Sequence, residues 1–398
     1  MQNLYEPSGK QRIQSIDILR GAIMLIMAID HIRDFFHNVG PGVDPTNMAT
    51  TTPFLFFTRW ITHFCAPNFV FLSGISIYLA GTRRSKSELS NFLIKRGVWL
   101  IFVELVLITF ALTLNPLYSV IVLQVIWAIG FSMIILGLLV RAPLTIIAIL
   151  GGLIFFGHDI LDFVKLPAMG PGGILLKLFF TAFGTVIPLG GNRIILDLYA
   201  VIPWTGVMFL GYVFGQLYSS AFDQQRRKKI LMISGCTLIA LFVVLRFINV
   251  YGDPSHWSVQ HSSVFSILSF LNTSKYPPSL LYLCMTIGPA LVILSLVENV
   301  QNKLTAILST YGSVPFFYYI LHFYLLRIIN IIVFFASGFG VNQIVSPKSA
   351  FLFSPPGFGF NLLGVYIVWL VVIATLYLPC RWFSKYKMTH KYWWLSYL

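Results

Sequence analysis

Apolar runs of around 20 residues recur along the whole of this 398-residue chain, and they constrain its fold more than any other feature. A run of that length crosses the hydrocarbon core of a bilayer as a helix, which pairs its backbone polar groups internally. Hydrophobic residues make up 57% of the chain and charged residues only 10%, so a soluble domain is excluded. We predict an all-α fold, a polytopic membrane helix bundle, in a single integral-membrane domain over residues 1–398.

The predicted bundle has about ten transmembrane helices. The apolar runs that define them cover residues 16–37, 57–81, 93–113, 118–140, 142–160, 197–218, 230–250, 278–298, 311–336 and 359–381. The long connections, at 38–56, 161–196, 251–277 and 337–358, are rich in glycine, proline and aromatic residues. Within 161–196, the stretch from Gly172 to Leu189 is apolar but interrupted by Lys177 and Pro188, and we predict a re-entrant or interfacial segment there.

The basic residues lie unevenly on the two sides of the predicted bundle. One set of flanks carries 17 of them: Lys10, Arg12, Arg83, Arg84, Lys86, Lys95, Arg96, Arg141, Arg226, Arg227, Lys228, Lys229, Lys303, Arg381, Lys385, Lys387 and Lys391. The opposite loops carry five, namely Lys165, Lys177, Arg193, Lys275 and Lys348. The positive-inside rule therefore places both termini in the cytoplasm. This topology explains the net charge of +14, and we predict no nucleic-acid partner because no basic run accompanies a soluble domain.

The first span contains many ionisable residues for a membrane segment. They are Asp17, Arg20, Asp30, His31, Arg33 and Asp34. An ionisable group at membrane depth is costly, which makes a functional site the default hypothesis. Arg20 and His31 share one face of the helix and lie ~16 Å apart along its axis. We interpret this face as a path into the membrane that begins at the charged Arg20 and ends at His31.

Ordered motifs extend this pattern from residue 12 to residue 322. They are Ser15-Ile-Asp17-x-x-Arg20-Gly21…Asp30-His31-x-Arg33-Asp34, Arg59…His63-x-Cys65-Ala66-Pro67-x-Phe69-x-Phe71-x-x-Gly74, Asn272-x-x-Lys275-Tyr276-Pro277-Pro278-Ser279, and Tyr311-Gly312-x-x-Pro315-Phe316-Phe317-Tyr318-Tyr319-x-x-His322. Together they resemble the transmembrane acyltransferase superfamily, most closely the bacterial relatives of heparan-alpha-glucosaminide N-acetyltransferase. More distant members, the O-acyltransferases of surface polysaccharides, share the Asp-x-x-Arg motif and place a histidine 14 residues after the aspartate, as Asp17 and His31 do.

The resemblance implies an acetyl-CoA-dependent membrane acetyltransferase. Such an enzyme takes acetyl groups from cytoplasmic acetyl-CoA and delivers them to the amine or hydroxyl of an extracytoplasmic glycan or amino sugar, across a bacterial inner (plasma) membrane. Histidine can remove the acceptor's proton near neutral pH, or it can carry the acetyl group itself. We predict His31 in this role, with Asp34, three residues further along the helix, as its orienting partner.

The choice of catalytic histidine stays open. Members of the human type place the proposed catalytic histidine in the first lumenal loop, but loop 38–56 of this chain contains none. His31, His37 and His63 are therefore all candidates. His63 lies four residues after Arg59, on the same helix face, and we predict that it assists His31 or binds the acceptor.

The remaining candidates are assigned by the side of the membrane on which they lie. Arg20, Lys95 and Arg96 are predicted to bind the phosphates of acetyl-CoA on the cytoplasmic side. Asp30, Arg33, Arg59, Lys275 and His322 are predicted to bind the acceptor on the opposite side. Glu104, in the third span, has only apolar neighbours in the sequence, and we expect an arginine from another helix to pair with it.

A secondary transporter or permease for a sugar- or lipid-linked substrate is the alternative class, since buried charges also mark transport pathways. A transporter predicts two pseudo-symmetric halves, whereas the transferase predicts a tunnel from Arg20 to His31. The chain has no Walker motif and no HExxH motif, and we predict no metal site. The acceptor, the formation of an amide or an ester, and assembly into a homodimer stay open.

Overall fold

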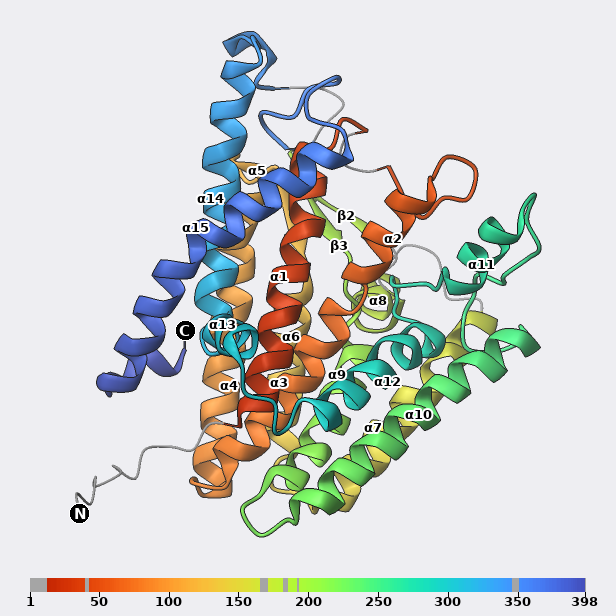
Figure 1. Cartoon of the computed structure of the whole chain (residues 1–398), viewed down its shortest axis with the longest axis vertical. Coiled ribbons are helices and arrows are strands. Elements are labelled where there is room, and N and C mark those ends of the chain that lie inside the picture. Colours follow the sequence, from red (N-terminus) through yellow and green to blue (C-terminus); the bar gives the residue numbers. More distant parts are fainter. Residues whose placement is uncertain are drawn as a thin grey trace.

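The computed structural model describes residues 13–39, 43–164, 171–181, 185–191, 193–345 and 351–397. It is a bundle of helices with the first helix near its centre (Figure 1). The helices are α1 (Gln14–Phe36), α2 (Pro53–Thr62), α3 (Cys65–Gly81), α4 (Lys86–Val103), α5 (Thr109–Thr113), α6 (Val125–Leu139), α7 (Leu144–Gly157), α8 (Pro171–Leu176), α9 (Val201–Phe214), α10 (Gln224–Ile248), α11 (Ser263–Leu271), α12 (Leu280–Leu296), α13 (Lys303–Gly312), α14 (Pro315–Ala336) and α15 (Leu362–Thr389). Three short strands, β1 (Val120–Leu123), β2 (Thr185–Gly190) and β3 (Arg193–Asp197), form one sheet.

The helices coincide with the spans expected from the apolar runs. Seven helical segments among the described residues are long and apolar enough to cross a membrane: Pro53–Gly81, Lys86–Thr113, Leu144–Phe163, Val201–Tyr218, Gln224–Ile248, Pro315–Ala336 and Leu362–Thr389. The other expected spans correspond to α1 and to the shorter apolar helices α6 and α12. The fold class is confirmed as an all-α polytopic membrane bundle, whereas the cytoplasmic location of both termini stays a prediction.

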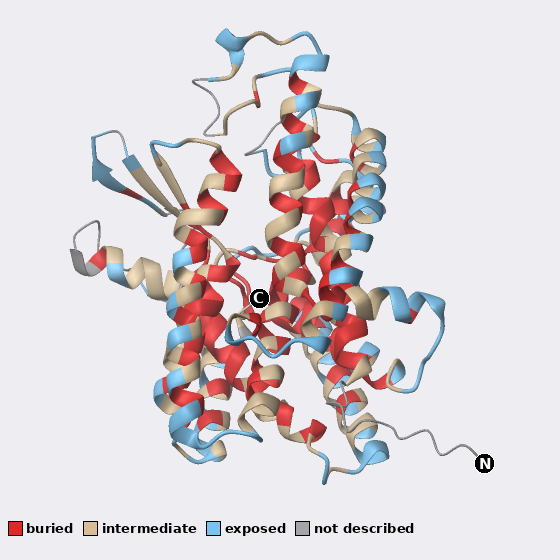
Figure 2. Ribbon diagram, turned by 90° about the vertical axis from the view of Figure 1, so that its left-hand side faces the viewer, coloured by how far each residue is buried: buried red, intermediate tan, exposed pale blue. Residues whose placement is uncertain are grey.

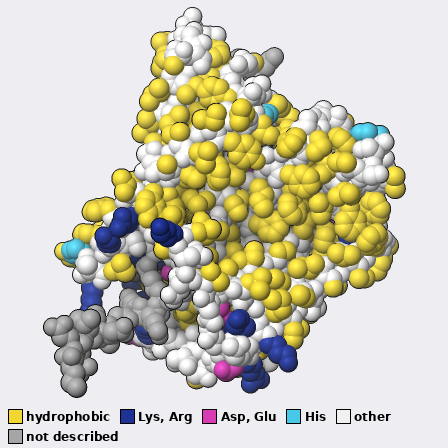
Figure 3. Space-filling model, in the orientation of Figure 1, with side chains coloured by type: hydrophobic (Ala, Val, Ile, Leu, Met, Phe, Trp, Pro, Cys, Tyr) yellow, Lys and Arg dark blue, Asp and Glu magenta, His cyan; other side chains and the backbone are white. Residues whose placement is uncertain are grey.

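The distribution of side chains fits a membrane protein. Hydrophobic side chains cover the middle of the face in Figure 3, and most of the Lys and Arg side chains visible there lie toward its lower part. Inside, buried residues form one cluster that runs through the centre of the bundle (Figure 2). Four basic residues used in the charge argument, Lys10, Arg12, Lys165 and Lys348, lie outside the described residues.

Two expected spans are interrupted next to prolines. The span at 57–81 breaks at His63, between α2 and α3. Pro67 has no amide hydrogen to donate to the His63 carbonyl four residues earlier, and the Tyr282 hydroxyl donates to that carbonyl instead, at 2.8 Å. The span at 311–336 breaks before Pro315, which begins α14 at a position where an amide hydrogen would have no helical partner.

The sheet departs from the sequence prediction. The expected span at 118–140 begins with β1, which pairs in parallel with β3, while β2 pairs with β3 in the antiparallel direction. Among its described residues, the predicted re-entrant or interfacial segment from Gly172 to Leu189 contains most of α8, a π-helical turn at Lys177–Thr181 and most of β2, and its position relative to the membrane stays a prediction. Short runs of β-branched and leucine residues suit a strand as well as a membrane helix, and here the pairing of distant segments decides the outcome.

Glycines of the sequence motifs allow α1 to approach its neighbour closely. A Cβ atom built on Gly21 of α1 would overlap the carbonyl oxygen of Leu308 in α13. Likewise, a Cβ atom on Gly312 would overlap the carbonyl oxygen of Asp17. The two backbones therefore touch at this crossing, which fixes the rotation of α1 and hence the direction in which its ionisable side chains point.

Candidate functional site

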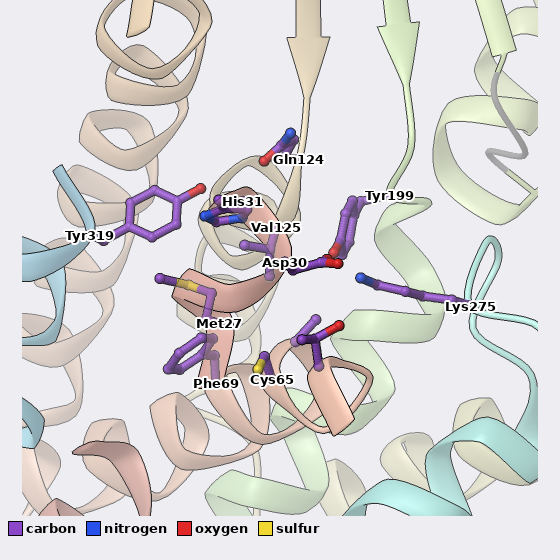
Figure 4. Close-up of a pocket in the computed structure, with 12 residues that line it drawn as sticks. Met27, Asp30, His31, Cys65, Phe69, Gln124, Val125, Tyr199, Lys275 and Tyr319 are labelled. Atoms are coloured by element: carbon purple, nitrogen blue, oxygen red, sulfur yellow. The ribbon is translucent and has the colours of Figure 1, made fainter. Parts of the chain in front are cut away.

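The charged face of α1 leads to a small cavity inside the bundle. Asp30 and His31 of α1, Lys275 from the loop before α12 and Tyr319 of α14 line it (Figure 4). Met27, Thr62, Cys65, Ala66, Phe69, Gln124, Val125 and Tyr199 complete the lining. The cavity has a volume of about 30 Å³, which is room for about one water molecule. Segments that are far apart in the sequence therefore meet around His31.

His31 is paired with a second histidine, which comes from α14. Nδ1 of His31 lies 2.7 Å from Nε2 of His322. Nδ1 of His322 lies 3.2 Å from the carbonyl oxygen of Tyr318. The ring of Phe323 stacks on His31 with 4.4 Å between the ring centroids. His322 is fully buried and does not line the cavity. It therefore contacts His31 and not the space in which the predicted acceptor would bind.

These contacts determine where the protons of the pair lie. A carbonyl oxygen only accepts hydrogen bonds, so Nδ1 of His322 carries a proton and donates it to the Tyr318 carbonyl. In neutral His322 the other nitrogen, Nε2, is then an acceptor, and Nδ1 of His31 donates to it. Neutral His31 consequently keeps a lone pair on Nε2. This is the tautomer that can accept a proton or attack a carbonyl carbon.

A cluster of ion pairs lies next to the histidines. Asp30 forms an ion pair with Arg59 of α2 and a second one with Arg33, at 3.0 Å. The predicted pairing of His31 with Asp34 is wrong, because Asp34 pairs with Arg33 at 2.6 Å. The side chain of Asp34 is 47% exposed, so it faces outward while His31 faces the cavity. The structure thus brings Asp30, Arg33 and Arg59 together, as expected for one site, and leaves Asp34 at its edge.

Lys275 reaches the same cavity from a distant loop. Its side chain and that of Asp30 point toward each other across the cavity (Figure 4). Its Nζ lies 5.0 Å from the centroid of the Tyr276 ring and 6.0 Å from that of the Tyr199 ring. Although it belongs to a loop, Lys275 is buried, which separates it from the ordinary loop lysines that extend into solvent.

Buried carboxylates hold the loop that carries Lys275. Asp253 accepts hydrogen bonds from the amide of Ser274 at 2.8 Å and from the hydroxyl of Ser279 at 2.7 Å. Arg246 lies 4.0 Å from Asp253, and Asp159 accepts a hydrogen bond from the amide of Leu280 at 2.8 Å. Because both ends of the loop are fixed, Lys275 is positioned before any ligand binds.

A second cavity begins at the other end of the charged face. It has a volume of about 110 Å³ and is lined by Arg20, Arg96, Met24, Leu100, Met133 and neighbouring apolar residues. Arg20 donates hydrogen bonds to Asp17 at 3.2 Å, to the Gly312 carbonyl at 3.1 Å and to Ser76 at 2.8 Å. Lys95 is exposed and takes no part in this lining, so the structure separates it from the two arginines with which it was grouped.

The two cavities share a wall. Phe69, Val125 and Tyr319 line both the chamber of His31 and the chamber of Arg20. In place of the expected continuous tunnel, the structure has two separate chambers that share these three lining residues. Movement of these three side chains would bring the two chambers into connection, because each of the three lines both.

The other two candidate histidines lie elsewhere. His63 is buried, with its ring centroid 5.4 Å from that of Tyr282, and it is not part of the lining of either chamber. Its Nδ1 has no hydrogen-bond partner among the described residues. His37 lines a separate cavity of about 20 Å³ with Arg33 and Asp34, at the C-terminal end of α1. Of the three histidines, only His31 both lines one of the two chambers and has a hydrogen-bond partner, His322, that sets its tautomer.

The sheet explains why sequence reasoning missed part of the site. Gln124 follows β1 and Tyr199 comes shortly after β3, and both line the chamber of His31. Because β1 and β3 are parallel, the residues that follow them emerge at the same end of the sheet. The only sequence signal was a polar or aromatic residue just after an apolar run, and that signal is too common to single out a site.

Glu104 has a different partner from the one expected. Within the described part of the chain it forms no ion pair with an arginine. Instead, its carboxylate accepts a hydrogen bond from the amide of Trp127 at 3.2 Å, in the first turn of α6. A carboxylate at a helix N-terminus interacts favourably with the unpaired amides there. Glu104 therefore fixes the start of α6, where Gln124 and Val125 line the chamber of His31.

Together the fold and the site define a class: a multi-pass membrane protein with a histidine pair and an ion-pair cluster inside its helix bundle. The sequence model of the family described as heparan-alpha-glucosaminide N-acetyltransferase, catalytic, matches residues 12–247, which is more than half of the chain. The chain therefore belongs to this family of membrane acetyltransferases. No curated protein matches the chain. The family match includes His31 and Arg59 and ends before Lys275 and His322, which the fold brings to the same site.

Proposed function

We propose that this protein transfers an acetyl group from cytoplasmic acetyl-CoA to the amine or hydroxyl of an extracytoplasmic sugar, in the inner membrane of a bacterium. The observation that carries the proposal is the His31–His322 pair, because it leaves Nε2 of His31 unprotonated and His31 lines a chamber inside the bundle. Membership of the acetyltransferase family supports the reaction type.

The chamber of Arg20 and Arg96 is the proposed donor site. Guanidinium groups bind phosphate oxygens with paired, charge-assisted hydrogen bonds, and CoA carries several phosphates at its nucleotide end. The apolar wall formed by Met24, Leu100 and Met133 suits the uncharged arm that ends in the thioester. The thioester reaches His31 once Tyr319 and its two neighbours in the shared wall move aside.

Two reaction sequences are compatible with this geometry. In direct transfer, Nε2 of His31 takes the proton of the acceptor amine or hydroxyl while that group attacks the thioester carbonyl. The C–S bond then breaks, and the CoA thiolate receives the proton from His31. In the carrier sequence, Nε2 attacks the thioester carbonyl and the C–S bond breaks, so that CoA leaves as the thiolate. The acceptor then attacks the acetyl-imidazole, the bond between Nε2 and the acetyl group breaks, and the acceptor's proton passes through Nε2 to the thiolate. In both sequences His322 holds the proton of His31 on Nδ1.

The ion-pair cluster and Lys275 form the proposed acceptor side. Asp30 pairs with Arg59 and Arg33, Asp34 also pairs with Arg33, and Lys275 adds a further cation across the chamber. Such groups orient the hydroxyls and amines of a sugar through charge-assisted hydrogen bonds. Their fixed positions orient the reacting amine or hydroxyl toward Nε2 of His31, which is the role that orientation has in acyl transfer. The chamber has to widen to admit a whole sugar, because its volume of about 30 Å³ is room for about one water molecule.

Labelled acetyl-CoA tests this proposal. Membranes that contain the protein should transfer the label to an extracytoplasmic glycan, and His31→Ala should lower the rate by at least ~10²-fold. The matched control is His261→Ala, which removes an exposed histidine in an outer loop and should leave the rate unchanged. Elution of each variant as a monodisperse protein in detergent shows that it has folded.

Two results would overturn the assignment. Full activity of His31→Ala together with loss of activity in His63→Ala or His37→Ala would move the catalytic role to an outer histidine. If the membranes transfer no label from acetyl-CoA and instead accumulate a sugar, the transporter alternative replaces the transferase.

A further inference from the structure

A large apolar crevice lies away from the histidine site. It has a volume of about 290 Å³ and is lined by α3, α7, α9, α10 and α12, through residues that include Phe155, Val207, Leu238 and Ile287. Apart from Ser234 and Thr237, both on α10, every lining side chain is a hydrocarbon. No step of the proposed acetyl transfer uses this space.

The crevice separates two tightly packed pairs of helices. A Cβ atom on Gly235 of α10 would lie 2.7 Å from the Gly288 carbonyl of α12, so these two helices are in backbone contact. A Cβ atom on Gly206 of α9 would lie 2.6 Å from the side chain of Ile154 and 3.3 Å from the amide nitrogen of Phe155, so α9 and α7 are also tightly packed. Because the two helices of each pair pack directly against each other, the unfilled space lies between the α7–α9 pair and the α10–α12 pair.

The crevice is open to the surroundings of the bundle. Only 22% of the most apolar part of α10 is buried, and the same fraction applies to α7. Figure 1 shows α10 at the edge of the bundle with α7 behind it. In a membrane these exposed surfaces face hydrocarbon. Ile233 and Thr237 of α10 line the crevice and are themselves exposed, so lipid chains have direct access to it.

Hydrocarbon is the occupant that this lining favours. Protein interiors are close-packed, and a space of this size needs an occupant to keep normal packing density. A buried water molecule needs about 2–4 hydrogen-bond partners, and this lining offers only the hydroxyls of Ser234 and Thr237. A flexible acyl chain fills an irregular apolar crevice without any polar partner.

Charge along α10 selects the kind of lipid. Arg226, Lys229, Ile233 and Thr237 follow one another at spacings of three or four residues and so lie on one face of the helix. Arg226 and Lys229 are both exposed, and Lys229 lies ~6 Å along the axis from the crevice residue Ile233. Arg227, by contrast, is engaged in an ion pair with Glu298. A chain in the crevice therefore has its headgroup beside two exposed cations.

We propose that this crevice binds one acyl chain of an anionic phospholipid, with the headgroup phosphate at Arg226 and Lys229. The headgroup lies at the surface that the positive-inside rule assigns to the cytoplasm. The lipid closes the gap between the α7–α9 pair and the α10–α12 pair. It comes from the leaflet opposite the acetyl acceptor, so it is a structural ligand and not a substrate.

Native mass spectrometry of the purified chain tests the proposal with phosphatidylglycerol as the probe and phosphatidylcholine as the zwitterionic comparison. The chain should retain phosphatidylglycerol preferentially. The double variant Arg226→Gln/Lys229→Gln should weaken its binding by about tenfold. The matched control, Lys303→Gln/Lys385→Gln, removes two exposed cations from the same basic side and should leave the binding unchanged.

A second variant tests the crevice itself. Thr237 is exposed, so Thr237→Phe fills the crevice from its open side without disturbing the helix contacts at Gly235. This variant should lose the bound lipid while it keeps both cations and elutes as a monodisperse protein. Equal losses in the control and the Arg226→Gln/Lys229→Gln variant would overturn the headgroup site, and unchanged binding in Thr237→Phe would overturn the acyl-chain site.

Discussion

Substitution of His322 by two different amides separates its two hydrogen bonds. In His322→Asn the side-chain amide takes the place of Nδ1, so it still donates to the Tyr318 carbonyl but does not reach His31. In His322→Gln the side-chain oxygen takes the place of Nε2, so it accepts the proton that Nδ1 of His31 donates. Only the glutamine therefore keeps His31 in the tautomer with a lone pair on Nε2.

The contacts of His31 give the size of the expected effect. Without an acceptor at 322, the buried Nδ1–H of His31 is unsatisfied, which costs about 1–3 kcal/mol. Movement of the proton to Nε2 relieves this cost but removes the lone pair that acts on the substrate. Because a general base contributes roughly 10²–10⁴-fold, we expect kcat to fall by about 10²-fold in His322→Asn. We expect His322→Gln to stay within about tenfold of the unmodified protein.

The assay is transfer of labelled acetyl from acetyl-CoA to the acceptor, with kcat and KM determined separately. The affinity for acetyl-CoA should be the same in both variants, since His322 lies outside the donor chamber. Similar melting temperatures in detergent would show that both variants fold. Equal activity of the asparagine and glutamine variants, whether high or low, would refute the argument that His322 acts by setting the tautomer of His31.

The remaining predictions concern packing, donor binding and topology. Gly21→Ala places a methyl group against the backbone of α13 and should cost about 1–3 kcal/mol, seen as a lower melting temperature in detergent, whereas Gly152→Ala, with nothing within 4 Å of the added atom, should have little effect. Equal shifts in both variants would contradict the close contact between α1 and α13. Arg20→Ala should weaken acetyl-CoA binding in equilibrium dialysis, and Lys95→Ala should weaken it far less because Lys95 is exposed and outside the chamber; the opposite order would move the donor site. Reporter fusions at residues 45 and 225 should report opposite sides of the membrane, and a report from the same side would refute the topology.

The sequence alone determined the fold class and one wall of the site. Apolar runs, charge flanks and helix periodicity are local properties, so they predicted the bundle and the ionisable face of α1 without knowledge of its neighbours. Asp30, Arg33 and Arg59 were expected to act together, and they form one ion-pair cluster. The motif glycines Gly21 and Gly312 also have a physical reason, since they permit the contact between α1 and α13.

Only the tertiary structure decided which group each buried polar side chain pairs with. His31 was expected to pair with Asp34, its neighbour on the helix, but its partner is His322, which is 291 residues away in the sequence. Glu104 was expected to meet an arginine and instead binds the first turn of α6. Hydrogen-bond partners depend on how each helix is rotated against the next, and close contacts between distant backbones set that rotation. Hydrophobicity can be read from one segment at a time, whereas the direction of a buried polar side chain has no local signal.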